Sequence, residues 1–221
     1  MVWSTQIIFY TKPNNNSLRK KCIKMRKAFK IILATFAVLI IVIVAFGAII
    51  FLDAATYTAT GSQTLTPTGT SIGKALVVYD PGLSGIAKGV ADKIASDLQT
   101  ESFTVTLAGI KSSVVTNTTD YGVVIVGGPI YAGSPTVSVK DFLNNLSPGH
   151  ASSGYGPYIF TRVGVFGSGQ GATSPSDVAM IRNSVAALSD NGTLSNAVVV
   201  KIGQTEDLNA RAADFVNQVV K

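Results

Sequence analysis

Three glycine-rich segments contain the residues whose types could bind a ligand. They are residues 80–88 (DPGLSGIAK), 127–135 (GGPIYAGSP) and 167–173 (GSGQGAT). Glycine allows a ligand to approach the backbone closely. Backbone N–H groups at the start of a helix attract an anion such as phosphate without help from side chains, and Lys88 could add a positive charge. The expected chemistry is therefore noncovalent binding of a ligand close to the backbone.

Other chemistry is restricted by the composition of the chain. The 221 residues include one cysteine, Cys22, and one histidine, His150. This excludes an internal disulfide and a multi-histidine metal site. His150 lies in the polar stretch SPGHASSGYGP without a partner at motif spacing, and we interpret it as a loop residue. No P-loop, GxSxG, HExxH or paired-carboxylate motif occurs, so we predict no catalytic residue and no metal ligand.

The positive charge of the chain is confined to its N-terminal segment. The chain has 18 Lys and Arg against 12 Asp and Glu. Eight of the basic residues precede residue 31, and the first acidic residue is Asp53, so the remainder has 10 basic against 12 acidic residues. A nucleic-acid-binding domain normally has a basic face of its own, which excludes this class.

Residues 31–52 form an uncharged apolar run that follows the basic tail, residues 1–30. A helix of this length spans ~33 Å, enough for a hydrocarbon core of ~30 Å. The run exceeds the ~7–15 residues of a signal-peptide core, so we interpret it as a retained single-pass anchor in the cell membrane. The positive-inside rule predicts a cytoplasmic N-terminus and a globular domain outside. Met25 is an alternative start, and Asn117 and Asn191 begin sequons compatible with glycosylation.

The rest of the chain divides into a linker, residues 53–73, and a domain, residues 74–221. The linker is rich in Thr, Ser and Gly, contains Pro67, and is predicted to be flexible. In the domain, apolar runs at residues 74–79, 123–126, 163–166 and 197–202 predict buried strands, and the alternating run 103–107 is typical of an edge strand. Four helical patterns, which start at Ile86, Val139, Val178 and Leu208, alternate with them, while residues 111–121 show little periodicity. This alternation predicts an α/β doubly wound fold with a parallel sheet.

The carboxyl ends of parallel strands lie at one edge of the sheet, where we expect the three glycine-rich segments to converge. The segments KALVVYDPGLSGIAKGVADKIASDL, DYGVVIVGGPIYAGSPTVSVKDFLNNL and RVGVFGSGQGATSPSDVAMIRNSV, in that order and spacing, resemble flavodoxin. The resemblance covers residues 74–221, and GGPIYAG is its most specific part. It implies a five-stranded parallel sheet of order 2-1-3-4-5, FMN as cofactor, and electron transfer as function.

The resemblance also implies the residues that contact the cofactor. The phosphate would lie in the first segment, at Gly82, Ser84, Gly85, Ile86, Ala87 and Lys88. The isoalloxazine ring would be flanked by Pro129, Ile130, Tyr131, Ala132 and Gly133, and by Ser168, Gly169, Gln170 and Gly171.

The first segment departs from the family pattern. Flavodoxins typically have Thr-Gly-Asn-Thr before the helix, whereas this chain has Ile86 and Ala87 in place of Asn and Thr. Ser84 is then the remaining hydroxyl, and Pro81 supplies no N–H. Asp80 opposes an anion if it points inward, or caps the turn or the helix if it does not.

Three functions remain open on these residues. The first is a membrane-anchored electron carrier that binds FMN and meets a redox protein at the membrane surface. The second is an FMN-dependent oxidoreductase of quinone-type acceptors on the same fold. The third is a flavin-free extracytoplasmic interaction module. The altered phosphate segment favours the third function, whereas the intact GGPIYAG segment argues against it. We rank the three functions in the order given, with a carrier ahead of a turnover enzyme.

Overall fold

The computed structural model describes residues 30, 32–49, 59–82, 84–118, 120–146 and 162–221. The chain divides into two compact units, Met1–Ile49 and Ile50–Lys221, and each is described by itself. Four predictions lie outside the described residues. They concern the basic tail with Cys22, the ends of the membrane span at residues 31 and 50–52, the first part of the linker at residues 53–58, and His150.

The N-terminal unit contains one long apolar helix, Ile32–Ile49. Its mean hydropathy is 3.0 over 18 residues, and none of that window is buried inside the protein. Within the described part of the chain it is the one helix that is long and apolar enough to cross a membrane. A helix that is apolar on every side is poorly suited to water, and its length and composition are sufficient for a membrane span.

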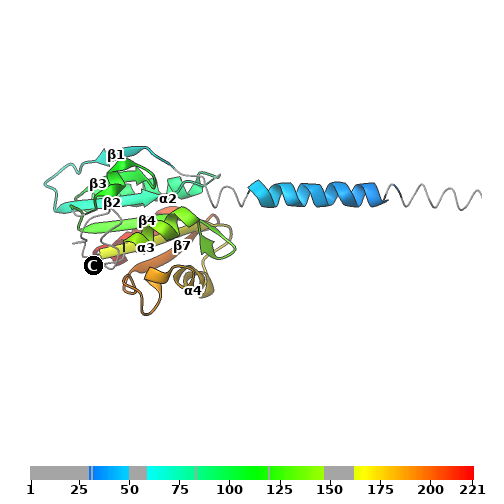
Figure 1. Ribbon diagram of the computed structural model, residues 1–221. Coiled ribbons are helices and arrows are strands. Elements are labelled where there is room, and N and C mark those ends of the chain that lie inside the picture. The colour runs from blue at the N-terminus through cyan, green and yellow to red at the C-terminus, as the bar shows by residue number, and fades with distance from the viewer. Residues whose placement is uncertain (1–29, 31, 50–58, 83, 119, 147–161) are drawn as a thin grey trace, which may run out of the picture. The chain divides into compact units, whose positions relative to one another are not determined.

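The second unit is an α/β domain in which one sheet lies between helices (Figure 1). Its strands are β1 (Ser62–Leu65), β2 (Gly73–Tyr79), β3 (Phe103–Gly109), β4 (Val123–Tyr131), β5 (Ser134–Pro135), β6 (Arg162–Gly169) and β7 (Val198–Gly203). Its helices are α2 (Ile86–Thr100), α3 (Val137–Asn145), α4 (Pro175–Asn183) and α5 (Leu208–Val220), with short 3₁₀ turns η1 (Ser113–Thr116) and η2 (Ala186–Leu188).

The sheet differs from the predicted five parallel strands in having 7 strands of mixed direction. Its order is β1-β3-β2-β4-β6-β7, and β5 pairs with β4. The five strands from β3 to β7 in this order are parallel, as the α/β alternation predicts. The difference comes from β1, which is antiparallel to β3, and from β5, which forms a two-residue hairpin with the end of β4.

The prediction of a flexible linker over residues 53–73 is wrong for its second half. Ser62–Leu65 is strand β1, in register with Val105 to Ala108 of β3. Few apolar residues accompany the alternating Thr and Ser residues, and the strand forms through backbone pairing with β3. The prediction that residues 103–107 form an edge strand is also wrong, because β3 lies between β1 and β2 in the sheet.

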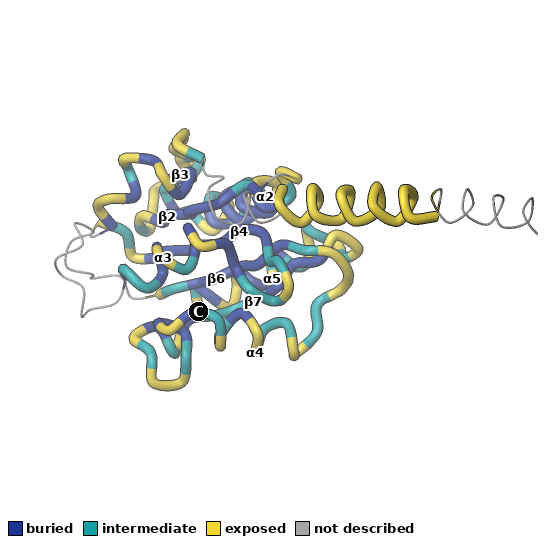
Figure 2. Tube along the Cα trace, turned by 45° about the vertical axis from the view of Figure 1, so that its right-hand side comes forward, coloured by how far each residue is buried: buried dark blue, intermediate teal, exposed yellow. Residues whose placement is uncertain are grey.

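The core lies on both faces of the parallel strands, whose dark blue traces run through the centre of Figure 2. In β2, Ala75, Val77 and Tyr79 face α2 and α5, whereas Leu76 and Val78 face α3 and α4. Alternate residues thus enter opposite halves of the core, which explains why β2 reads as a continuous apolar run. The predicted third helical stripe, which starts at Val178, is divided between α4 and η2.

One exposed glycine in α2 offers a test of the helix assignment. Gly89 lies in the second turn, and a Cβ built there meets no atom within 4 Å. Glycine costs roughly 0.5–1 kcal/mol relative to alanine inside a helix. Gly89→Ala should therefore raise the free energy of unfolding by about that amount, measured by denaturant unfolding in detergent. A loss of stability would contradict the helical geometry assigned to this residue.

Candidate functional site

The three glycine-rich segments meet at the carboxyl ends of the parallel strands. They line one cavity of about 640 Å³, within the ~300–1,000 Å³ typical of small-molecule sites. Its lining comes from the segment after β2, from the carboxyl ends of β4 and β6 with the residue that follows each, and from one residue after β7. The lining residues are Ser84, Ile86, Pro129, Ile130, Tyr131, Ala132, Ser168, Gly169, Gln170 and Gln204. The convergence predicted from the order of strands and loops is thus present in the fold.

The chemistry of the lining suits a flat apolar ligand with polar edges. Ile86 and the Pro129–Ala132 stretch supply apolar surface, including the aromatic ring of Tyr131. Ser84, Ser168, Gln170 and Gln204 supply hydroxyl and amide groups. Among the described residues that line the cavity, none carries a charge at neutral pH. Such a lining can orient a ring by hydrogen bonds at its edges and stack against its face.

The start of α2 is the place for an anionic group. Helices α3, α4 and α5 each begin with a side-chain cap, from Thr136, Ser174 and Asp207 respectively. Helix α2 begins after Gly85, which has φ 69°, without a side-chain cap and without an acidic residue in its first turn. Its first N–H groups therefore remain available in the described part of the chain, apart from a long bond of 3.4 Å from Ile86 N to Ser84 Oγ. Ser84 and Ile86 line the cavity, so the uncapped start of α2 lies at its edge.

A buried carboxylate fixes the first segment against the second. Asp80 is fully buried and accepts hydrogen bonds of 2.8 Å from the hydroxyls of Thr136 and Ser138 at the start of α3. Its other oxygen accepts a longer bond from Gly82 N. A Cβ on Gly82 would lie 2.7 Å from Cγ of Pro129, so glycine is required for this approach. Asp80 therefore holds the two segments together and is bonded to α3 rather than directed at the start of α2.

A second set of polar contacts fixes the third segment against the loop after β7. Glu206 Oε2 accepts hydrogen bonds of 2.7 Å from Gly203 N and from Thr173 Oγ1. Glu206 Oε1 lies 3.4 Å from Arg211 Nε. Gln204 N donates to the carbonyl of Gly169 at 3.1 Å, which brings Gln204 to the cavity. These bonds set the position of the cavity wall formed by Ser168 to Gln170.

Some of the predicted contact residues lie beside the cavity rather than in its lining. Ala87 is buried in the core, and Gly133, with φ 81°, lies against Met180. The ammonium group of Lys88 is 2.8 Å from Asp92 and 6.0 Å from the ring centroid of Tyr79, beside a separate cavity of about 220 Å³. The hydrogen bond to Asp92 raises the pKa of Lys88. The predicted contact residues that do not line the cavity are Gly82, Gly85, Ala87, Lys88, Gly133 and Gly171.

Two residues near the cavity were missed in the sequence. Gln204 lines it, and Lys201 lies buried behind the third segment, with Cε 3.6 Å from a Cβ built on Gly169. Both belong to the carboxyl end of the fifth parallel strand. The rule that predicts convergence of the other loops applies to this strand as well, so its position was the signal that could have found them.

The acidic groups around the third segment give the domain a defined response to acid. Hydrogen bonds from Ser174 lower the pKa of Asp177 below its ordinary value of 3.8. For Glu206 burial raises the pKa, but the hydrogen bonds from Gly203 and Thr173 outweigh burial and hold the pKa below its ordinary value of 4.5. Depressed folded-state pKa values contribute stability that is complete above the unfolded values.

We therefore expect the contribution of Asp177 and Glu206 to the free energy of unfolding to be complete above about pH 5 and to fall as the pH drops through their depressed folded-state pKa values. Thermal unfolding followed between pH 3 and pH 7 measures this slope. Glu206→Gln and Asp177→Asn should each make it shallower, whereas an exposed control, Asp190→Asn, should leave it unchanged. An unaltered slope in both of the first two variants would contradict the assignment.

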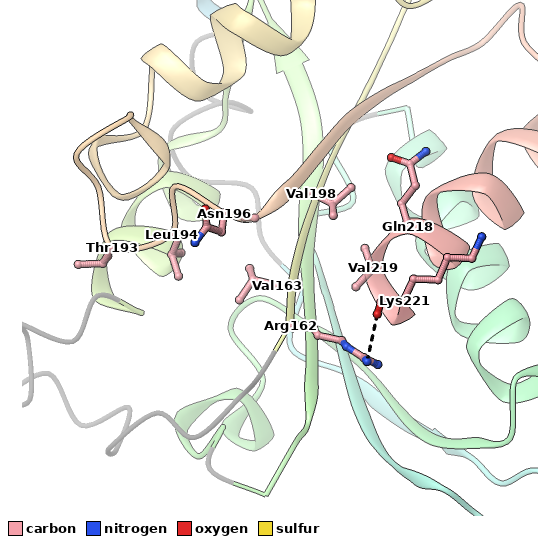
Figure 3. A pocket seen from close by; sticks show the side chains of 10 residues that line it. Arg162, Val163, Thr193, Leu194, Asn196, Val198, Gln218, Val219 and Lys221 are labelled. Atoms are coloured by element: carbon pink, nitrogen blue, oxygen red, sulfur yellow. Dashed lines mark hydrogen bonds between the residues drawn. The ribbon is translucent and has the colours of Figure 1, made fainter.

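A second cavity lies at the opposite, amino-terminal end of the parallel strands. It has a volume of about 330 Å³ and is lined by the start of β6, the segment before β7 and the end of α5 (Figure 3). Arg162 donates a hydrogen bond of 3.4 Å to the carbonyl of Lys221 across it. The predicted ligand-contacting residues do not line this cavity, so the candidate site is the cavity at the carboxyl end.

Comparison with known proteins adds the following. No family model and no curated protein match the chain. Among solved structures it is similar to a short-chain flavodoxin associated with a bacterial microcompartment (18% identity, TM-score 0.43, 67% of this chain and 97% of that one). It is similar to flavodoxin 2 from Bacillus cereus (18%, 0.41, 65% and 95%) and to rubredoxin oxygen:oxidoreductase from Desulfovibrio gigas (18%, 0.42, 68% and 36%). This chain spans about a third of the length of the last protein. These likenesses concern the fold alone. In its fold, the chain resembles the flavodoxins, as its sequence motifs predict.

Proposed function

We propose that the chain is a membrane-anchored, flavodoxin-like protein that binds FMN in the cavity at the carboxyl end of the sheet and carries electrons. The observation that supports this best is the pairing of an uncharged, largely apolar cavity with the uncapped start of α2. The cavity suits the ring, and the helix start suits the phosphate. FMN would supply the redox chemistry, and the protein would supply binding, orientation and electrostatics.

The roles of the individual residues follow from their positions. The backbone N–H groups at the start of α2, beside Ser84, would hold the phosphate. Tyr131 and the Pro129–Ala132 stretch would pack against the ring. Ser168, Gln170 and Gln204 would hydrogen-bond its polar edges, and the bonds made by Glu206 and Asp80 would keep the surrounding segments in place.

The direct test is a titration of the full chain, purified in detergent, with FMN. Binding should quench flavin fluorescence and alter the visible spectrum, with a dissociation constant in the micromolar range or below. Riboflavin is the matched ligand control, because it has the same ring without the phosphate. Absence of binding to a folded chain at 100 µM FMN would overturn the proposal in favour of the flavin-free interaction module.

The proposed location is the cell membrane, with one span from the apolar helix, the N-terminus in the cytoplasm and the domain outside. The hydropathy of Ile32–Ile49 and the preceding basic residues support it. The redox partner would then be a protein at the same membrane surface. Protease added to intact cells should remove the domain and leave the N-terminal tail, whereas protection of the domain would place it on the cytoplasmic side.

A further inference from the structure

Lys201 is a buried cation directly behind the wall of the candidate cavity. Its side chain is 10% exposed, and its Nζ lies 3.1 Å from Asp177 Oδ2 and 3.5 Å from the carbonyl of Ala172. The stem of Lys201 packs on the backbone of Gly169, because a Cβ there would lie 3.6 Å from Lys201 Cε. Gly169 itself lines the cavity. The alkyl stem of the lysine, rather than the carboxylate of Asp177, therefore contacts the rear of this wall.

Two other groups near the cavity carry charge: the Glu206–Arg211 pair, in which the charges balance, and the buried carboxylate of Asp80, which is bonded to hydroxyls of α3 on the side of the first two segments. Glu206 and Arg211 form the second ion pair, 3.4 Å apart. Asp177 also accepts hydrogen bonds of 2.9 Å from Ser174 N and 2.8 Å from Ser174 Oγ, which tie its carboxylate to the start of α4. Within the described lining of the cavity no charged group stands between Lys201 and a ligand. Charges act over longer distances in a poorly solvated interior than in water, so a ligand at this wall experiences the field of the lysine and its partner.

We propose that Lys201 sets the affinity of the cavity for an anionic ring and thereby raises the reduction potential of the bound flavin, a role that rests on the proposed binding of FMN. A bound flavin would gain one negative charge when a redox partner, or dithionite in the test, supplies two electrons and the solvent supplies one proton. An ammonium group behind Gly169 stabilises that charge, and the carboxylate of Asp177 opposes it. Charge near the ring is one of the ways in which a protein tunes a flavin.

The test compares two variants that act on the same ion pair with opposite signs. The full chain in detergent, loaded with FMN, is reduced with dithionite against a dye of known potential. Lys201→Met should weaken binding of the reduced form relative to the oxidised form three- to tenfold, and tenfold corresponds to about 30 mV for two electrons. Asp177→Asn should shift the potential in the opposite direction. Lys201→Arg, which keeps the charge, should restore the wild-type value.

The controls separate an electrostatic role from a structural one. Lys93 pairs with Asp97 on α2 and does not line the cavity, so Lys93→Met should leave the potential unchanged. A purely structural role for the Lys201–Asp177 pair would lower the melting temperature of both variants without shifts of opposite sign. Unchanged potentials, or shifts of the same sign, would overturn the role of Lys201 while FMN binding stands. If the wild-type chain binds no FMN, both proposals fail.

Discussion

Replacing Ser84 by aspartate should weaken FMN binding by one to two orders of magnitude without unfolding the domain. Ser84 is exposed, lines the cavity, and precedes the uncapped start of α2. A carboxylate here would repel a phosphate at close range, at a cost of ~1.4–2.8 kcal/mol for a partly solvated pair of like charges. The same carboxylate favours the helix, because acidic groups stabilise helix N-termini. Loss of binding would therefore be accompanied by equal or greater thermal stability.

The matched variant and the matched ligand make this result specific to the phosphate. Ser84→Asn has nearly the same shape as the aspartate variant but no charge, and should change FMN affinity by less than threefold. Riboflavin should bind both variants equally well. Lys88→Ala should have a small effect, because Lys88 is paired with Asp92 beside another cavity. If Ser84→Asp weakened the binding of FMN and of riboflavin equally, the phosphate would not lie at the start of α2.

The largest expected loss of stability comes from Gly203→Ala at the end of β7. A Cβ on Gly203 would lie 1.7 Å from the carbonyl oxygen of Gly171, so the third segment and the loop after β7 would have to separate. The hydrogen bond of 2.7 Å from Gly203 N to Glu206 would be disturbed as well. We expect the free energy of unfolding to fall by ~2–4 kcal/mol, since overpacking against backbone has no flexible side chain to absorb it. Calorimetry of the full chain in detergent measures the loss.

Gly171→Ala is the control for this steric argument. Gly171 has φ 72°, but a Cβ there meets no atom within 4 Å. Its replacement carries only the cost of a left-handed residue, ~1–2 kcal/mol. The Gly203 variant should also lose FMN affinity, because Gln204 and the Ser168–Gln170 wall move apart. A Gly203 variant as stable as wild type would mean that the two loops do not pack as closely as described.

The positions of most strands and of the site could be predicted from local sequence patterns, namely apolar runs and glycine-rich segments. The apolar runs of β2, β4 and β6 are largely buried on both faces, so nearly every residue in them is apolar, whereas the valines of β7, the edge strand, are only partly buried. The glycine-rich segments lie after β2 and at the carboxyl ends of β4 and β6, and residues of all three segments line one cavity. The sequence alone therefore predicted the domain core and most of the cavity lining.

The parts that could not be predicted depend on contacts between distant residues. Strand β1 contains Ser, Gln and Thr, and it is a strand because its backbone pairs with β3, which no local apolar pattern reports. In the sequence, Lys88 could interact either with a ligand at the start of α2 or with Asp92. In the structure it pairs with Asp92, four residues later on the same face of the helix. The direction of Asp80 depended on the hydroxyls of Thr136 and Ser138, more than 50 positions away in the chain.

Strand β1 also determines how the domain behaves when the chain is shortened. It covers the outer backbone of β3 over Val105 to Ala108, and its side chains are mostly exposed and polar. A fragment that starts at residue 74 leaves these N–H and C=O groups unpaired on a flat strand, which is a template for pairing with another molecule. Proteolysis between β1 and β2 followed by release of β1 would thus turn a protected sheet edge into a site of self-association and aggregation.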